Sequence, residues 1–95
     1  MDLFVTNSET AVVDALKAYP KIPAATIKAL HRYVVDKIPT GGFLNAILTN
    51  NLLESCARAD EWNKAALFDI LSFCYNEIPS PCWKSKQAVQ EWLKK

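Results

Sequence analysis

Apolar residues recur at helical spacing along most of the chain, and prolines or small polar residues interrupt them. The clearest run lies between Pro23 and Pro39, where apolar positions follow the i, i+3, i+4, i+7 pattern of an amphipathic helix. A proline is tolerated in the first turn of a helix, and the residue before a proline is driven out of the α region. The run therefore predicts a helix bounded by these prolines. Its apolar stripe comprises Ile27, Leu30, His31, Val34, Val35 and Ile38.

Two further helices are predicted at the ends of the chain. Asn7 or Ser8 can cap the first helix, which Pro20 ends. Its apolar positions are Val12, Val13, Leu16 and Tyr19. Ser85 can cap the last helix, with Val89, Trp92 and Leu93 on its apolar face.

The middle of the chain predicts a third helix from near Gly42 to about Arg58 and a fourth from Asp60 to Pro79. One long bent helix is the alternative. We favour a break at residues 58–60, because an unbroken helix of about 37 residues would exceed the usual length in a compact domain. The wide apolar stripe of the third helix predicts that it is the most buried one. That stripe comprises Phe43, Leu44, Ile47, Leu48, Leu52, Leu53 and Cys56.

No stretch shows the alternation of a strand. The expected architecture is therefore all-α, a compact bundle of four to five helices in a single domain over residues 1–95. Hydrophobic residues make up 51% of the chain and charged residues 22%, which is enough apolar surface to favour a folded chain over a disordered one.

The net charge is only +1, so a dedicated nucleic-acid binder is not expected. The charges are nevertheless segregated, with +3 over residues 21–42, −3 over 60–78 and +3 over 79–95. Such segregation is typical of solvated helix faces. A functional basic patch of Lys21, Lys28, Arg32 and Lys37 is the alternative reading.

Three cysteines form no pairing pattern, which favours a reduced, intracellular protein. Cys56 and Cys74 fall on apolar helix faces, and Cys82 falls in a loop. The first ten residues lack the features of a signal peptide, and no apolar run reaches the ~20 residues that a membrane span needs. We expect a cytoplasmic protein without a membrane segment.

The only two glycines, Gly41 and Gly42, stand together before an apolar helix. They could admit an anion or a nucleotide phosphate at the helix start, with Lys37 or Arg32 supplying charge. A nucleotide loop usually follows a strand and carries a longer signature, whereas this pair follows a helix. We therefore favour a compact corner between two helices, in which the glycines permit unusual backbone angles and close approach.

Catalytic chemistry has little support. His31 is the only histidine, and its place beside an apolar stripe favours a role at the core boundary over that of a general base. A Cys82–His31 pair has no supporting local motif, and three scattered cysteines with one histidine do not make a zinc site. We expect no enzyme activity, no metal and no cofactor. A helix-turn-helix around residues 39–42 would lack basic residues on its recognition helix.

Three tryptophans are many for a domain of this size. Trp92 shares a helical face with Val89, and Trp62 lies at the start of a helix. Trp83 precedes Lys84 in a proline-rich loop, where it either anchors the loop in the core or forms an exposed interface hot spot.

Four segments of the chain form a combined pattern. They are P-x-G-G-F-L-x-A-x-L-x-N from Pro39, R-A-D-x-x-N from Arg58, Y-N-x-x-P-x-x-C-W-x-S from Tyr75 and V-x-x-W-L from Val89. Together they resemble small uncharacterised proteins of bacteriophages and prophages. The resemblance covers roughly residues 30–93, and it implies a phage or prophage origin, hence the host cytoplasm, without any activity. Many such sequences have a glycine where this chain has Lys84.

Within the second segment, Asp60 can cap a helix and Asn63 can return a hydrogen bond, while Arg58 can pair with Asp60 or with helix carbonyls. A polar binding site is the alternative for these three residues.

The sequence favours a small non-enzymatic accessory protein that binds and modulates a host protein, with inhibition of a host defence as one role that the phage class suggests. Self-association is also expected, because the apolar load can exceed what one small bundle buries. The interaction candidates are Trp83, Trp62, Lys84, Arg58, Asp60 and Asn63. A small-ligand or nucleotide binder is the alternative, and a DNA-binding regulator is third.

Overall fold

The computed structural model describes residues 9–95, which fold into helices without any strand among them. The all-α class is thus confirmed. The proposed caps Asn7 and Ser8 lie outside the described residues. In chain order the elements are α1 (Glu9–Ala18), α2 (Ala24–Asp36), α3 (Gly42–Leu48), α4 (Leu52–Arg58), α5 (Glu61–Ala65), α6 (Leu67–Glu77), the 3-10 turn η1 (Ser80–Cys82) and α7 (Lys86–Lys94).

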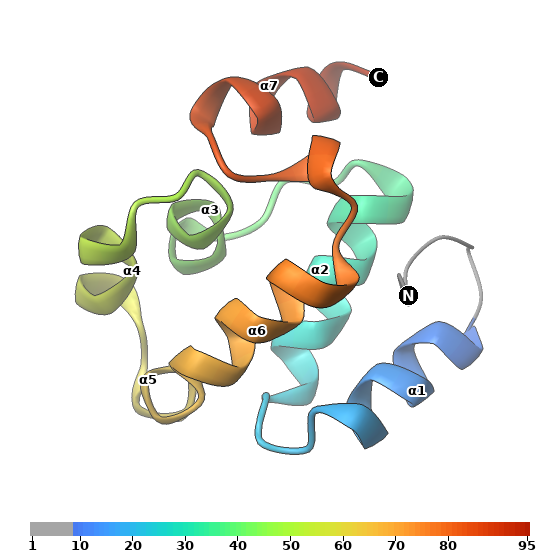
Figure 1. Ribbon diagram of the computed structural model, residues 1–95, viewed down its shortest axis with the longest axis vertical. Coiled ribbons are helices and arrows are strands. Elements are labelled where there is room, and N and C mark those ends of the chain that lie inside the picture. Colours follow the sequence, from blue (N-terminus) through green and yellow to red (C-terminus); the bar gives the residue numbers. More distant parts are fainter. Residues whose placement is uncertain (1–8) are drawn as a thin grey trace.

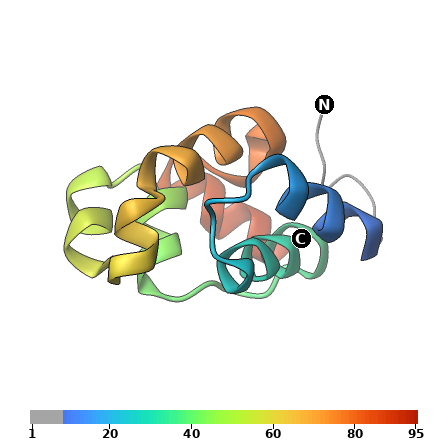
Figure 2. The same cartoon turned by 90° about the horizontal axis from the view of Figure 1, so that it is seen from below.

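Helices α2 and α6 lie on opposite sides of the core, with α1 beside them at one end and α3 and α7 towards the other (Figures 1 and 2). The Tyr19 ring at the end of α1 meets the Phe73 ring of α6 edge-on at 4.9 Å, and its hydroxyl donates to Glu77 Oε2 at 3.0 Å. The fully buried large side chains include Ile27 and Leu30 of α2, Leu48 of α3, and Ile70 and Phe73 of α6.

Tyr33 joins α2 to the C-terminal part of the chain. Its side chain is 1% exposed, and its hydroxyl donates to the carbonyl of Cys82 in η1 at 2.6 Å. Its own carbonyl accepts a bond of 3.1 Å from Trp92 Nε1 in α7. Burial raises the pKa of the Tyr33 hydroxyl well above its ordinary value, so the hydroxyl keeps its proton and stays a donor.

The expected third helix is two helices, which is a correction to the sequence reading. Asn50 adopts a left-handed φ of 63°, a region that asparagine enters more easily than most residues. The Asn51 side chain then caps α4 by accepting from Glu54 N at 3.2 Å. The turn sends the second half of the expected stripe outward, so Leu52, Leu53 and Cys56 are exposed and the prediction of burial for them is wrong.

The predicted break near residues 58–60 is confirmed, because Ala59 is extended and Asp60 caps α5. The expected fourth helix is itself divided at Ala66, whose φ of −101° and ψ of 9° depart from helical values. Seven α-helices therefore stand within residues 9–95, and the expected count of four to five is wrong. The cap at Ser85 is confirmed, since its Oγ accepts from Ala88 N at 3.0 Å.

The glycine pair does not have the conformational role that the sequence suggested. Neither glycine has a positive φ, and Gly41 is extended, with φ −69° and ψ 177°. A Cβ atom at Gly41 would meet nothing within 4 Å. At Gly42 it would come within 2.9 Å of Nη1 of Arg58, the far end of a flexible side chain. The prediction that the two glycines form a corner by permitting unusual backbone angles and close approach is therefore wrong, because a side chain is sterically tolerable at both positions.

Lys84, in contrast, does adopt a conformation that favours glycine. Its φ is 92°, and its backbone N–H donates to the Leu48 carbonyl at 2.8 Å, which fixes the connection between η1 and α7 against α3. A side chain at such a φ brings Cβ close to the backbone. The contact to α3 therefore carries local backbone strain.

We expect Lys84→Gly to raise the free energy of unfolding relative to Lys84→Ala by about 1 kcal/mol, because only glycine relieves this strain. Alanine is the matched control, since both substitutions remove the ammonium that lies 5.5 Å from the Trp83 ring. Urea denaturation of the two variants measures the difference. Equal stabilities would contradict the strained conformation.

The three cysteines differ sharply in access. Cys56 is exposed on α4, whereas Cys74 in α6 and Cys82 in η1 are buried. Burial also raises the pKa of the Cys74 thiol to about 12, so its sulfur stays protonated and unreactive at neutral pH.

We expect a thiol reagent to modify one of the three cysteines in the native protein and all three in denaturant. Colorimetric thiol titration at neutral pH checks this count, and Cys56→Ser should abolish the native reaction. Rapid native modification of a second cysteine would contradict the described packing.

Candidate protein-binding site

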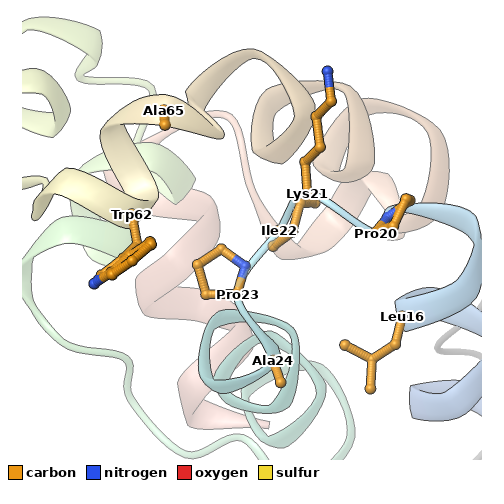
Figure 3. Close-up of a pocket in the computed structure, with 8 residues that line it drawn as sticks. All are labelled: Leu16, Pro20, Lys21, Ile22, Pro23, Ala24, Trp62 and Ala65. Atoms are coloured by element: carbon orange, nitrogen blue, oxygen red, sulfur yellow. The ribbon is translucent and has the colours of Figure 1, made fainter.

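A groove of about 630 Å³ lies between the turn that joins α1 to α2 and the short helix α5 (Figure 3). Most of the side chains along it are apolar, and Lys21 is its one charged residue. Its lining residues are Leu16, Pro20, Lys21, Ile22, Pro23, Ala24, Trp62 and Ala65.

The α1–α2 side of the groove is held by local backbone bonds and one buried anchor. Pro20 ends α1, and Pro23 stands immediately before α2 with a φ of −56°. Between them, Ile22 is only 3% exposed, and its N–H donates to the Tyr19 carbonyl at 3.1 Å. Two prolines flanking a buried isoleucine give this wall of the groove a stiff backbone.

Trp62 forms the other wall. It is the second residue of α5, and its side chain is 77% exposed. In Figure 3 its ring lies towards Pro23 across the groove, while the Lys21 side chain extends away from the ring. A large aromatic side chain left this exposed beside an apolar groove is typical of an interface anchor.

Asp60 and Asn63 position the helix that carries Trp62. Asp60 Oδ1 accepts from the backbone N–H of Asn63 at 2.8 Å and from its Nδ2 at 3.1 Å. Asn63 Oδ1 accepts in turn from Oγ1 of Thr26, a 5% exposed residue of α2, at 2.6 Å. The amide of Asn63 therefore fastens α5 to α2, and Trp62 is held facing Pro23.

Arg58 does not take part in this network. Its Nε pairs with Glu54 Oε1 of the same helix at 2.5 Å, so the expected pairing with Asp60 is wrong. Both side chains are about half exposed, and such i,i+4 pairs contribute little stability. The guanidinium also lies against Gly42, at the start of α3.

Trp83 and Lys84 lie in a different part of the molecule from Trp62. They follow η1, at the opposite end of α6 from α5 (Figure 1). Trp83 is partly buried and packs on the core, and Lys84 is exposed with its ammonium over the Trp83 ring. The structure thus divides the expected interaction residues into the group around Trp62 and this second pair.

The candidate anion-binding residues are not gathered into a site. The Lys37 ammonium lies 4.6 Å from the centre of the Trp92 ring, and Lys37 itself ends α2 in a left-handed conformation. Arg32 is exposed on α2. Gly41 precedes helix α3, and Gly42 is its first residue. The helix has only seven residues. A cationic side chain that does lie against Gly42 is Arg58, and its guanidinium already pairs with Glu54.

The lining of the groove suits binding. Its surface offers apolar contact, an aromatic ring and one ammonium group. Within residues 9–95 no three His, Cys, Asp or Glu side chains gather as a metal site requires, and no helix there is long and apolar enough to cross a bilayer.

Sequence reasoning identified Trp62, Asp60 and Asn63 and named Lys21 only as part of a basic patch, but it did not assign Pro20 and Pro23 to a site. The prolines were interpreted only as helix boundaries. The useful signal was their spacing, which leaves two residues to span the turn and sets the stiff edge opposite Trp62.

Comparison of the chain with protein-family models, with curated proteins and with solved structures finds no match. The functional interpretation consequently depends on the geometry.

We expect Thr26→Val and Asn63→Ala each to lower the free energy of unfolding by about 1–2 kcal/mol, because each removes the bond between α2 and α5. The double variant should lose less than the sum of the two, since the bond from Thr26 to Asn63 can be lost only once, whereas the bond from Asn63 to Asp60 is lost with Asn63→Ala alone. Thermal denaturation of the four proteins measures this coupling, and strict additivity would contradict the link. Gln87→Ala, which removes only an exposed bond to Glu91 within α7, is the control.

Proposed function

We propose that this chain is a non-enzymatic interaction protein that binds another protein through the groove beside Trp62. The observation that carries the proposal is the 77% exposure of Trp62 on a helix that Asp60 and Asn63 fasten in place. A rigidly mounted aromatic side chain loses little conformational entropy on binding, which makes it a good anchor.

The lining of the groove defines the chemistry of the partner. A partner segment would cover Trp62 with an apolar side chain, which the groove accepts between Pro23 and Ala65. An acidic residue beside it would meet the Lys21 ammonium at the edge. We therefore propose a partner that presents an apolar residue next to an acidic one.

We propose a host-cell protein as this partner, because that is what the resemblance to phage and prophage proteins implies, and the chain would then act in the host cytoplasm. Modulation of a host protein, including inhibition of a defence protein, agrees with a small protein that acts by occupying a surface. The geometry favours neither alternative. The Lys37 ammonium lies over the Trp92 ring, and the helix after the glycine pair ends at Leu48, which is too short to follow a DNA groove.

The test is affinity capture from a lysate of the natural host, followed by mass spectrometry and by titration of the purified captured protein. We expect Trp62→Ala to weaken binding of that protein at least ~30-fold, as loss of an interface hot spot does. Lys21→Glu should also weaken binding, and the loss of affinity should be larger in low salt than in high salt, because that charge is at the rim.

Leu53→Ala is the matched control, because Leu53 is 84% exposed and does not line the groove. Its affinity should equal that of the unaltered protein. Capture that survives Trp62→Ala unchanged, or a lysate from which nothing is captured specifically, would overturn the proposal.

A further inference from the structure

The ends of α2 and α7 bring two lysine side chains onto one tryptophan ring. The Lys37 ammonium lies 4.6 Å from the centre of the Trp92 ring, and the Lys95 ammonium lies 5.0 Å from the same centre. In both views the two helix ends lie side by side (Figures 1 and 2). We call these three residues the Trp92 patch.

The patch is fastened to the core at a single acceptor. The Tyr33 carbonyl accepts a bond of 3.1 Å from Trp92 Nε1 and another of 3.1 Å from the backbone N–H of Lys37. Tyr33 is itself buried, and the Trp92 ring is partly buried against the core. The ring therefore has a fixed position, and the Lys37 backbone is held beside it.

No carboxylate of the described chain pairs with these two ammonium groups. The one ion pair within the described residues joins Arg58 to Glu54. The acidic residues closest to the patch in sequence are Asp36 and Glu91, and Glu91 accepts a bond from Gln87 of its own helix. Two like charges held over one ring repel each other, and an anion bound beside them would relieve that repulsion.

Lys37 reaches the ring from an unfavourable backbone conformation. Its φ of 56° and ψ of 41° lie in the left-handed region, where glycine or asparagine usually ends a helix. A cation–π contact near the surface is worth no more than the strain of a side chain in this region. Stability alone therefore does not explain a lysine here, and the strained conformation points to a role in binding.

We propose that the Trp92 patch binds an acidic segment of a second protein, with one carboxylate paired to Lys37 and another to Lys95. Carboxylates on alternate residues of an extended chain lie on one side of it, about 7 Å apart. Two ammonium groups within 5.0 Å of one ring centre can match that spacing. The edge of the indole ring carries partial positive charge, which also favours carboxylates there.

The two core-packed tryptophans favour an acidic protein segment over a nucleic acid. Single-stranded nucleic acid binds by stacking its bases on exposed aromatic faces. Lysine ammonium groups lie over both Trp92 and Trp83, and both rings are partly buried. The net charge of only +1, with −3 over residues 60–78, also gives a long polyanion little attraction beyond the patch.

An anionic bilayer is also a poorer partner than an acidic segment. A helix that lies on a membrane inserts its apolar face among the lipids. In α7 that face is already used, because Val89 is buried in the core and Leu93 packs against it. The lysines of the patch would meet the lipid surface without any apolar contact to support them.

The patch is separate from the groove beside Trp62. Pro23, which lines the groove, stands before the first residue of α2, and Lys37 follows the last one. A helix of 13 residues is about 20 Å long. The two surfaces therefore lie at opposite ends of α2, so the chain can hold an acidic segment at one end while the groove is occupied at the other.

Titration of the nitrogen-15-labelled full chain with a synthetic peptide tests the proposal by NMR. The probe is a capped decapeptide of alternating Glu and Ala, and its Gln–Ala counterpart is the uncharged control. We expect the acidic peptide to shift the Trp92 indole resonance and the backbone amides of Lys37 and Lys95, but not the Trp62 indole. Raising the salt from about 20 to 200 mM should weaken binding, because the charges are at the surface.

Substitutions of the lysines separate the patch from the general charge of the protein. Lys37→Gln together with Lys95→Gln should raise the dissociation constant of the acidic peptide about 10-fold, because two surface ion pairs are lost. Lys17→Gln together with Lys28→Gln is the matched control, since it removes two exposed lysines elsewhere and should leave the affinity unchanged. Lys37→Gly should weaken binding yet melt at or above the temperature of the parent, because glycine relieves the left-handed strain.

Three results would overturn the proposal. They are no shift of the Trp92 indole at millimolar acidic peptide, equal shifts with the Gln–Ala peptide, and a patch variant that binds as well as the control variant. Tighter binding of single-stranded DNA of equal charge would overturn it as well, and would assign the patch to nucleic acid. Since the Trp62 indole is observed in the same spectra, none of these results depends on the capture experiment at the groove.

Discussion

The hydrogen bond from the Tyr33 hydroxyl to the Cys82 carbonyl is the constraint on which the arrangement of the helices depends. It closes a loop of nearly fifty residues, and everything from α3 to α6 lies inside that loop. A buried carbonyl without a donor would be costly, so the bond from the Tyr33 hydroxyl stabilises η1 in its place. The adjacent bond from Trp92 to the Tyr33 carbonyl fixes α7 at the same point.

Helix boundaries marked by proline or by a strong cap could be predicted from the sequence. Asp60 and Ser85 each cap the helix that they were expected to cap, because such caps act over three residues. The breaks at Asn50 and Ala66 could not, since the apolar spacing continues through both. The Asn51 side chain caps a new helix, and this cap competes with continuation of the preceding helix. The apolar spacing alone does not show which of the two is more stable.

The candidate site shows the same division between local and distant information. The sequence indicated that Asp60 and Asn63 would interact, because they are three residues apart on one helix start. The bond that Asn63 accepts from Thr26 could not be predicted, because the two residues are 37 apart in the sequence and only the fold brings them together. The groove lies between two segments of the chain, and the sequence of neither segment indicates that the other lies beside it.

The three tryptophans stand in three different environments, and this has a spectroscopic consequence. The indole of Trp62 is largely in water and should emit at long wavelength, whereas Trp83 and Trp92 are packed on the core, with lysine ammonium groups near both rings. Covering Trp62 should shift only its share of the emission to the blue, while loss of the core should shift the other two to the red. The chain thus carries its own optical reporters, with opposite signs for occupancy and for unfolding.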